Sequence, residues 1–298
     1  MDNGIYNGND YLQIATAYNN RVRIYVTKTT NILVEAIKRK EMMATATAAL
    51  GRTLSATLMM GSMLKGSQSI AVKIDGGGPI GKIVAESEAT GKVMGYVENG
   101  GVYLKYNNGK LAVGLAVGNE GTLQVIKDLN LKEPFVSSVP LISGEIAEDF
   151  TYYFAVSEQV PSSVSLGVLV GLNGEVLASG GFIVQVMPDC DLSVIEKIEQ
   201  NIKQIKPISE LIVSKTKPRD IVKMILGDDD FEVLKVMPVK FECRCSKEKF
   251  RDGIKSLGFT SIKKMLDEDH QVEATCHYCG EKYIFDEEEL EEILMELD

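Results

Sequence analysis

Four of the five cysteines stand in two close pairs near the C-terminal end of the chain. A single arginine separates Cys243 from Cys245, two residues separate Cys276 from Cys279, and thirty residues lie between the pairs. Zinc binds four soft thiolate ligands in a tetrahedron, with each sulfur at about 2.3 Å. Two close pairs from distant segments can provide this geometry, so the sequence predicts one zinc ion held by these four sulfurs.

The two pairs differ in their local context. Residues 272–275 and 282–285 have strand-like composition and flank the second pair, and Gly280 provides the backbone freedom that a tight turn needs. This pattern predicts a zinc knuckle at a hairpin tip. The one-residue spacing of the first pair is shorter than the two to four residues usual in structural zinc sites. Both thiols could still reach one metal, or could form a small strained disulfide once the metal leaves. Spacing alone leaves two interpretations open, a structural zinc site and a zinc site meant to be oxidised.

The cysteine pattern and several other segments resemble the heat-shock protein 33 family, whose members are redox-regulated holdase chaperones. The matching segments are Phe-Glu-Cys-Arg-Cys-Ser at 241–246, Ser-Leu-Gly at 256–258 and Gly-Gly-Phe-Ile-Val-Gln at 180–185, followed by Pro188. The resemblance extends over nearly the whole chain, and the cysteines are its most specific part. It implies that oxidation joins Cys243 to Cys245 and Cys276 to Cys279 and releases the zinc.

The resemblance also implies a function. It predicts an ATP-independent chaperone, not an enzyme, that binds unfolding proteins after oxidation, protects them from aggregation and forms a homodimer when active. Two other classes remain open. A constitutive zinc-stabilised binding module would keep its zinc under moderate oxidant. A thiol-disulfide oxidoreductase would use Cys276 and Cys279 as an active dithiol, but that motif usually opens a helix, whereas here a strand pattern follows.

Length and composition agree with one large and one small domain in a globular protein. The chain has 298 residues, of which 45% are hydrophobic and 25% charged. Its first residues show no basic region followed by an apolar one, so we expect no secretory signal and a cytoplasmic location. In that setting paired cysteines favour metal or redox chemistry over a disulfide scaffold.

Charge argues against nucleic acid as a partner. The chain carries a net charge of −10, and from residue 241 onward eight Lys or Arg residues stand against sixteen Asp or Glu residues. Zinc ribbons that bind nucleic acid need a basic face for the phosphates. Catalytic groups are also few, because both histidines, His270 and His277, belong to the cysteine region. Cys190 stands alone and is expected to be a packing residue.

Residues 1–188 are predicted to form an α+β core domain. Residues 11–27 have strand character, and residues 42–64 form a long apolar run with Arg52 near its middle. Its Ala, Thr, Ser and Gly content favours a buried core helix over a membrane span. A helix is predicted over 144–158, and strands are predicted over 70–74, 82–86, 93–98, 101–105, 164–170 and 182–186. The glycine-rich residues 76–82 lack the Ser or Thr of a phosphate-binding loop and precede a strand, so they predict a connection.

Residues 189–235 are predicted to be an amphipathic helical linker. Asp189 or Asp191 can cap a first helix before Pro207, and a second helix is expected over 218–226. The first helix carries an apolar stripe of Leu192, Ile195, Ile198, Ile202 and Ile205. The linker is either docked permanently on the core domain or docked only while the zinc is bound. In the second case the stripe is the candidate client-binding surface.

Residues 236–298 are predicted to form a zinc-binding redox-switch module. A helix capped by Ser246 presents Phe250, Ile254 and Leu257, and a last helix starts at Asp286 with Glu289 in a capping box. So small a core is marginal without a cross-link. Structural zinc contributes about 10–16 kcal/mol in finger peptides, whereas whole folds are stable by about 5–15 kcal/mol. Loss of the metal is therefore expected to unfold the module.

Overall fold

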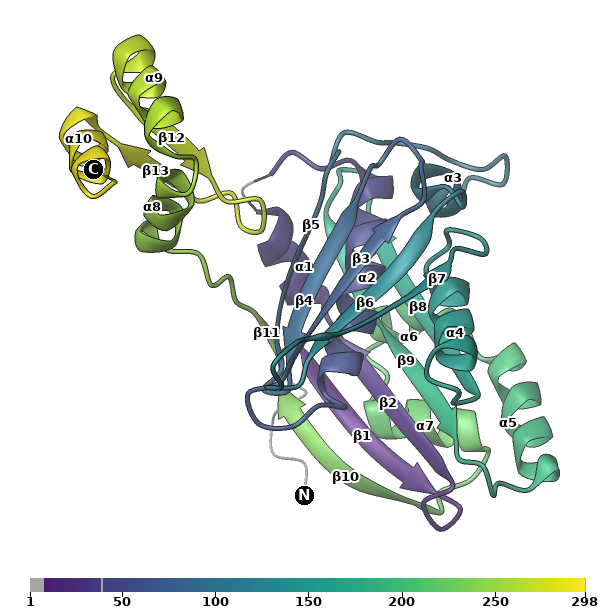
Figure 1. Cartoon of the computed structure of the whole chain (residues 1–298). Helices are drawn as coiled ribbons and strands as arrows, with labels where there is room; N and C mark the ends of the chain where they lie inside the picture. The colour runs from purple at the N-terminus through teal and green to yellow at the C-terminus, as the bar shows by residue number, and fades with distance from the viewer. Residues whose placement is uncertain (1–7, 39, 298) are drawn as a thin grey trace. The chain divides into compact units, whose positions relative to one another are not determined.

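The computed structural model describes residues 8–38 and 40–297. The chain divides into two compact units, Met1–Glu242 and Cys243–Asp298 (Figure 1), and we call the second one the cysteine unit. The first unit contains both the predicted core domain and the predicted linker. The division of function between residues 1–188, 189–235 and 236–298 stays a prediction. The α+β class is confirmed, because clustered antiparallel strands are combined with separate helices.

One sheet of the first unit has five antiparallel strands in the order β10-β1-β2-β9-β8. Their bounds are β1 Tyr11–Ala17, β2 Val22–Lys28, β8 Ser162–Val170, β9 Val176–Val186 and β10 Phe231–Pro238. The prediction of one strand over 11–27 is wrong, because a hairpin turn divides it. Tyr18, Asn19 and Asn20 all have φ between 52° and 66°, a left-handed conformation that asparagine adopts more readily than most residues.

The other sheet has six strands in the order β11-β5-β4-β3-β6-β7. Their bounds are β3 Ser69–Asp75, β4 Ile83–Glu88, β5 Lys92–Val97, β6 Thr122–Asp128, β7 Phe135–Pro140 and β11 Lys240–Phe241. Within this sheet β11 is parallel to β5 and the remaining pairs are antiparallel. Strands β6 and β7 were not predicted.

The predicted strand over 101–105 is wrong. In this segment Lys105 forms only an isolated bridge with Leu111. The backbone instead bonds to the start of a helix: Leu104 N–H donates to Thr45 Oγ1 at 3.0 Å, and Ala46 N–H donates to the Val102 carbonyl at 3.4 Å. The segment therefore caps the N-terminal end of the helix that begins at Ala44, and it adds no strand to a sheet.

Helix α2 (Ala44–Gly61) is the core helix predicted from the long apolar run. It is buried along nearly its whole length and contacts β4 and β5 of one sheet and β8 and β9 of the other. Arg52 bonds the Glu145 carboxylate at 2.6 Å, which pairs the one charge in the helix. Among the described residues, no helix is long and apolar enough to cross a membrane.

Three shorter helices complete the core of the first unit: α1 (Thr30–Ile37), α3 (Val113–Val117) and α4 (Ala147–Val156). The glycine-rich connection predicted over 76–82 is confirmed, since β4 follows it and its backbone lies against the end of α3. A Cβ atom on Gly76 or Gly78 would lie 2.4 Å from a backbone carbonyl oxygen there. Close backbone packing explains these glycines without a phosphate.

The linker region forms three helices: α5 (Leu192–Gln204), α6 (Ile208–Val213) and α7 (Pro218–Leu226). They share a core cluster with β1, β2 and β9, in which Ile198, Ile221 and Ile225 are buried. Helix α7 ends at Gly227, whose φ is 75°. Helix α6, which begins directly after Pro207, was not predicted.

The cysteine unit combines a hairpin with three helices. Its elements are α8 (Lys247–Lys255), α9 (Phe259–Asp269), β12 (Val272–Thr275), β13 (Lys282–Phe285) and α10 (Glu287–Met295). Its core consists of Ile254, Ile262, Leu266, Phe285, Leu290, Ile293 and Leu294. Both predicted caps are present, with Ser246 accepting from Lys249 N–H and Asp286 and Glu289 forming a capping box. The prediction for Leu257 is wrong: α8 ends at Lys255, and Leu257 is half exposed.

Candidate metal centre

The four paired cysteines come together in the cysteine unit. All four sulfurs lie within 4.8 Å of one another. Across the pairs, the sulfurs of Cys243 and Cys276 are 3.6 Å apart, and those of Cys245 and Cys279 are 3.5 Å apart. Cys276 is buried and the other three thiols are partly buried. Two segments more than thirty residues apart in sequence thus bring their four sulfurs together at one partly buried site.

The second pair is positioned by the hairpin of β12 and β13. Cys276 N–H donates to the Glu281 carbonyl, and Gly280 N–H donates to the Cys276 carbonyl, both at 2.8 Å. These bonds close a tight turn that contains Cys279. Gly280 has a φ of 74°, in the left-handed region that glycine enters without steric cost. The predicted knuckle is confirmed in its backbone form.

The first pair is positioned by the start of α8. Ser246 has extended backbone angles and caps the helix, with its side chain accepting from Lys249 N–H. The side chain of Lys249, in the first turn of α8, reaches back toward the cysteines, and its ammonium donates to the Arg244 carbonyl at 2.7 Å. Cys243 and Cys245 therefore lie on the short segment that leads into the capped start of α8.

The geometry of the four sulfurs fits zinc. A regular tetrahedron with bonds of about 2.3 Å has edges of about 3.8 Å. The contacts of 3.5 and 3.6 Å across the pairs lie close to that edge, and no sulfur pair is separated by more than 4.8 Å. An all-thiolate tetrahedral set suits zinc better than a hard cation such as magnesium. His277 is exposed and is not part of the four-residue cluster.

Tyr283 contacts the cluster and was not predicted as a site residue. Its hydroxyl donates a hydrogen bond to Cys245 Sγ at 3.2 Å, and its ring lies 5.0 Å from that of Phe250. The sequence signal for Tyr283 was the alternation of side chains between the two faces of β13, which places Tyr283 on the same face as the buried Phe285.

The thiols occupy different electrostatic environments. Burial raises the pKa of Cys243, and its neighbouring thiols add to that rise. Burial also opposes ionisation of Cys245, but the hydrogen bonds from Tyr283 and from nearby thiols outweigh it and lower the pKa of Cys245. The same contact raises the pKa of the Tyr283 phenol, so this hydroxyl remains a donor at neutral pH. Negative charge on sulfur is therefore best supported at Cys245.

Cys190 lies in the first unit, in the loop before α5. It packs against the cluster of the linker helices, and burial raises the pKa of its thiol. These features agree with the expected packing role.

The predicted client-binding stripe does not have one uniform environment. Ile198 is 3% exposed, and Ile202 and Ile205 are partly buried against the same cluster. Ile195 is partly exposed, and Leu192 at the start of α5 is 76% exposed. Most of the stripe is thus covered in this conformation, and its role in client binding stays a prediction.

Comparisons with known proteins agree over nearly the whole chain. The family model described as "Hsp33 protein" matches residues 10–286. The 33 kDa chaperonin of Bacillus subtilis is 51% identical over 283 residues, covering 95% of this chain and 97% of that protein. That of Geobacillus kaustophilus is 50% identical over 285 residues, covering 95% and 97%. A crystal structure of the 33 kDa chaperonin (heat shock protein 33 homolog) from Thermotoga maritima superposes with a TM-score of 0.91 at 38% identity, covering 96% of this chain and 98% of that one.

Proposed function

This chain belongs to the Hsp33 family, and from that membership we propose that it is a redox-regulated, ATP-independent holdase chaperone. The family is one of chaperonins, so the chain acts on proteins by binding them rather than by catalysis. The observation that carries the proposal is the convergence of four sulfurs within 4.8 Å of one another. This cluster can hold a metal when reduced and can form disulfides when oxidised.

In the reduced state, Cys243, Cys245, Cys276 and Cys279 would hold one zinc ion as thiolates. Zinc, when bound, supplies a cross-link among the four sulfurs. Seven buried residues form the core of the cysteine unit, and a core of this size needs such a cross-link to be stable. The hydrogen bond from Tyr283 supports the charge on Cys245.

Oxidation would remove the ligands by converting thiolates to disulfides. Each pair of thiolates gives up two electrons and forms one S–S bond. Hypochlorous acid accepts the two electrons and leaves as chloride and hydroxide, and hydrogen peroxide leaves as two hydroxides. We propose the pairing that the family resemblance implies, Cys243 with Cys245 and Cys276 with Cys279. All four sulfurs are close enough together for other pairings, so the pairing needs direct mapping.

The oxidised cysteine unit would then unfold, and the linker helices would loosen from the strands β1, β2 and β9 on which they pack. Their apolar faces, including Ile198 and Ile202, would become available to unfolding proteins in the cytoplasm. The active form would be a homodimer. Binding would keep clients from aggregating without an ATP cycle.

The structure disfavours a thiol-disulfide oxidoreductase. Strand β13, and not a helix, follows Cys276 and Cys279, so the second thiol pair lacks the helix N-terminus that usually activates such a dithiol. A constitutive zinc-stabilised binding module would have the same geometry and must be separated by experiment.

Aggregation of a chemically unfolded model protein, followed by light scattering, tests the proposal. The chain oxidised by hypochlorite should suppress scattering near equimolar ratio, whereas the reduced zinc-loaded chain should not. Equal suppression in both states would favour the constitutive module. Turnover of insulin disulfides with a dithiol donor would favour the oxidoreductase.

A further inference from the structure

Strand β11 covers an edge of the six-stranded sheet. It pairs in parallel with β5, placing Lys240 beside Lys92 and Phe241 beside Val93. Lys240 N–H donates to the Gly91 carbonyl, and Glu242 N–H donates to the Val93 carbonyl, both at 3.1 Å. Without β11, β5 would be the outermost strand there, and these two carbonyls would lose their donors.

Few side chains hold β11 in place. Phe241 is partly buried against the main core cluster, next to the buried Val239. Glu242 forms ion pairs with Lys92 and with Lys240, all of them at least partly exposed. Exposed ion pairs of this kind contribute about 1 kcal/mol or less each. Beyond the end of β10 at Pro238, the segment is held by the two backbone hydrogen bonds to β5, a backbone hydrogen bond from Val239 to the Asp10 carbonyl, and the side chains of Val239 and Phe241.

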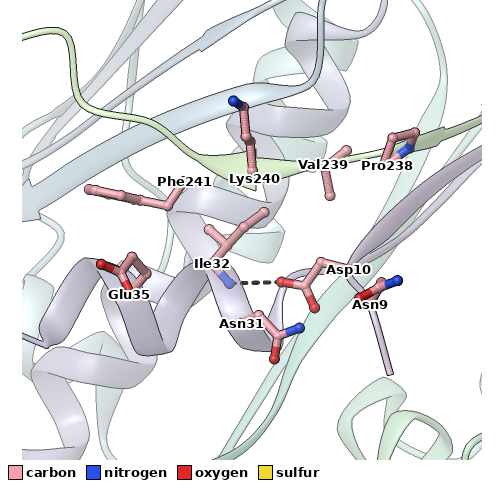
Figure 2. A pocket seen from close by; sticks show the side chains of 9 residues that line it. All are labelled: Asn9, Asp10, Asn31, Ile32, Glu35, Pro238, Val239, Lys240 and Phe241. Atoms are coloured by element: carbon pink, nitrogen blue, oxygen red, sulfur yellow. Dashed lines mark hydrogen bonds between the residues drawn. The ribbon is translucent and has the colours of Figure 1, made fainter. Parts of the chain in front are cut away.

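A hollow that is open to solvent lies beside this segment. A cavity of about 430 Å³ lies between residues 238–241 and helix α1 (Figure 2). Its walls include Ile32 and Glu35 of α1, which face the segment, and the side chain of Phe241. A different extended segment could be accommodated here with a larger apolar side chain.

The position of β11 in the chain links it to the cysteines. It contains only two residues, and the cysteine unit begins at Cys243, one residue after Glu242. Unfolding of the cysteine unit removes the anchor at one end of this short strand. Pairing at a sheet edge uses backbone groups, so it accepts segments of many sequences, and side-chain pockets then select among them.

We propose that the edge of β5 at Gly91–Val93, with the adjoining cavity on α1, is a docking site for an extended segment of a client protein. In the reduced chain β11 occupies the site and blocks it. The preferred client segment has an aromatic or branched apolar residue at the place of Phe241 and an acidic residue after it, near Lys92. This inference rests on the proposed function, because it needs the cysteine unit to unfold on oxidation.

A labelled peptide with the sequence of residues 237–242, Met-Pro-Val-Lys-Phe-Glu, tests the site on the unmodified full chain. Fluorescence anisotropy should show saturable binding to the oxidised chain about tenfold tighter than to the reduced chain, and an unfolded client should displace the peptide. A control peptide with Ala at the place of Phe should bind about tenfold more weakly, because it loses the buried aromatic side chain.

A photo-cross-linking residue at Lys92, compared with one at Val136 on β7 at the opposite edge of the same sheet, locates the contact. Client cross-links from position 92 should rise on oxidation, while those from position 136 should not change. Cross-links from position 92 only to a second copy of the chain would overturn the site.

Aggregation suppression measured on the same samples separates the two proposals. An oxidised chain that suppresses aggregation but binds neither peptide, or binds both equally, overturns the docking site alone. An oxidised chain that neither suppresses aggregation nor binds the peptide overturns the proposed function and the site with it.

Discussion

The hydroxyl of Tyr283 donates to Cys245 Sγ at 3.2 Å, and this bond is the contact that most directly modifies a proposed zinc ligand. Replacing such a hydrogen-bond partner typically costs about 10–100-fold in metal affinity. The change Tyr283→Phe keeps the ring beside Phe250 and removes only the donor. We expect zinc affinity, measured by competition with a chromogenic chelator, to fall about tenfold.

Tyr103→Phe is the matched control, because this tyrosine is exposed and lies in the first unit. It should leave zinc affinity unchanged. If both variants bind zinc as the unmodified chain does, the hydrogen bond from Tyr283 has no role in holding the metal.

The assignment of the ligands predicts a clear difference between cysteines. Purified under reducing conditions, the chain should contain about one zinc per chain, as four thiolates complete one tetrahedral shell. Cys190→Ser should retain this zinc, because Cys190 packs with the linker helices outside the four-sulfur cluster. Cys279→Ser should lose most of it. Elemental analysis of the two variants decides the matter, and zinc lost from Cys190→Ser would refute the assignment.

The pair of Arg52 and Glu145 predicts a dependence of stability on pH. Burial of Glu145 acts to raise its pKa, but the hydrogen bonds from Arg52 and Tyr106 outweigh it, so the pKa lies below its usual value. The unfolded chain then binds the proton more readily than the folded chain. The stabilisation is complete above the unfolded pKa of about 4.3 and is lost as pH falls through the lower folded pKa.

Glu145→Gln should therefore destabilise the first unit at neutral pH and lose this effect in acid. Breaking a buried pair costs about 3–5 kcal/mol, and the partial exposure of both side chains here makes the cost smaller. Urea unfolding at several pH values should show the gap to the unmodified chain narrowing below about pH 4.3. Glu148→Gln, on the exposed face of α4, is the control. A gap that stays constant with pH would show that the ionised pair is not its source.

Among the elements, helix α5 predicts how the linker is held. Ile198 is buried and Ile202 partly buried against the cluster shared with β1, β2 and β9, and burial of each aliphatic side chain stabilises by roughly 1.5–3 kcal/mol. Replacing both with Ser should weaken docking of α5, so that the reduced chain shows partial aggregation suppression. Leu192→Ser, on the same helix but 76% exposed, should leave the reduced chain inactive.

Light scattering of an unfolding client with the reduced variants measures this effect. If the Ile198 and Ile202 double variant is inactive when reduced and activates normally on oxidation, the stripe of α5 is not part of the switch.

Elements with strong local signals were predictable from sequence. Three of these features depend on residues that are neighbours in sequence: the hairpin around Gly280, the capping box at Asp286 and the helix that begins at Pro218. Helix α9 was missed because Gly258 precedes it without a side-chain cap and only Ile262 and Leu266 are buried along it.

Elements defined by distant partners were harder to predict. Strand β11 has two residues and exists because Lys240 and Phe241 meet Lys92 and Val93, far away in sequence. Strand β7 is an edge strand whose Phe135 and Val136 are both exposed, so apolar and polar residues do not alternate along it in the way that predicts a half-buried strand. The same reason applies at the metal centre, where the cysteine spacing predicted the cluster but the contact from Tyr283 depends on how the two segments meet.

For the molecule as a whole, the proposed switch makes the folding of a small unit depend on its metal. The cysteine unit has a core of seven buried residues, whereas the first unit has two much larger clusters. Loss of the four-sulfur cross-link should therefore unfold the cysteine unit and leave the sheets of the first unit folded. This difference in stability would allow a local oxidation to change the binding surface of a protein whose larger unit stays folded.

Following zinc release and aggregation suppression together in one sample, during oxidation by hypochlorite, is the most direct test of whether loss of the metal activates the chain. A chromogenic chelator reports the metal, and aliquots withdrawn over time are assayed for suppression of client aggregation and for disulfides by mass spectrometry. We predict that zinc release precedes or accompanies the gain of suppression, that disulfides join only the four clustered cysteines, and that a dithiol with added zinc reverses both changes. Aggregation suppression that reaches its full value while the zinc is still bound would contradict the proposal that loss of the metal activates the chain.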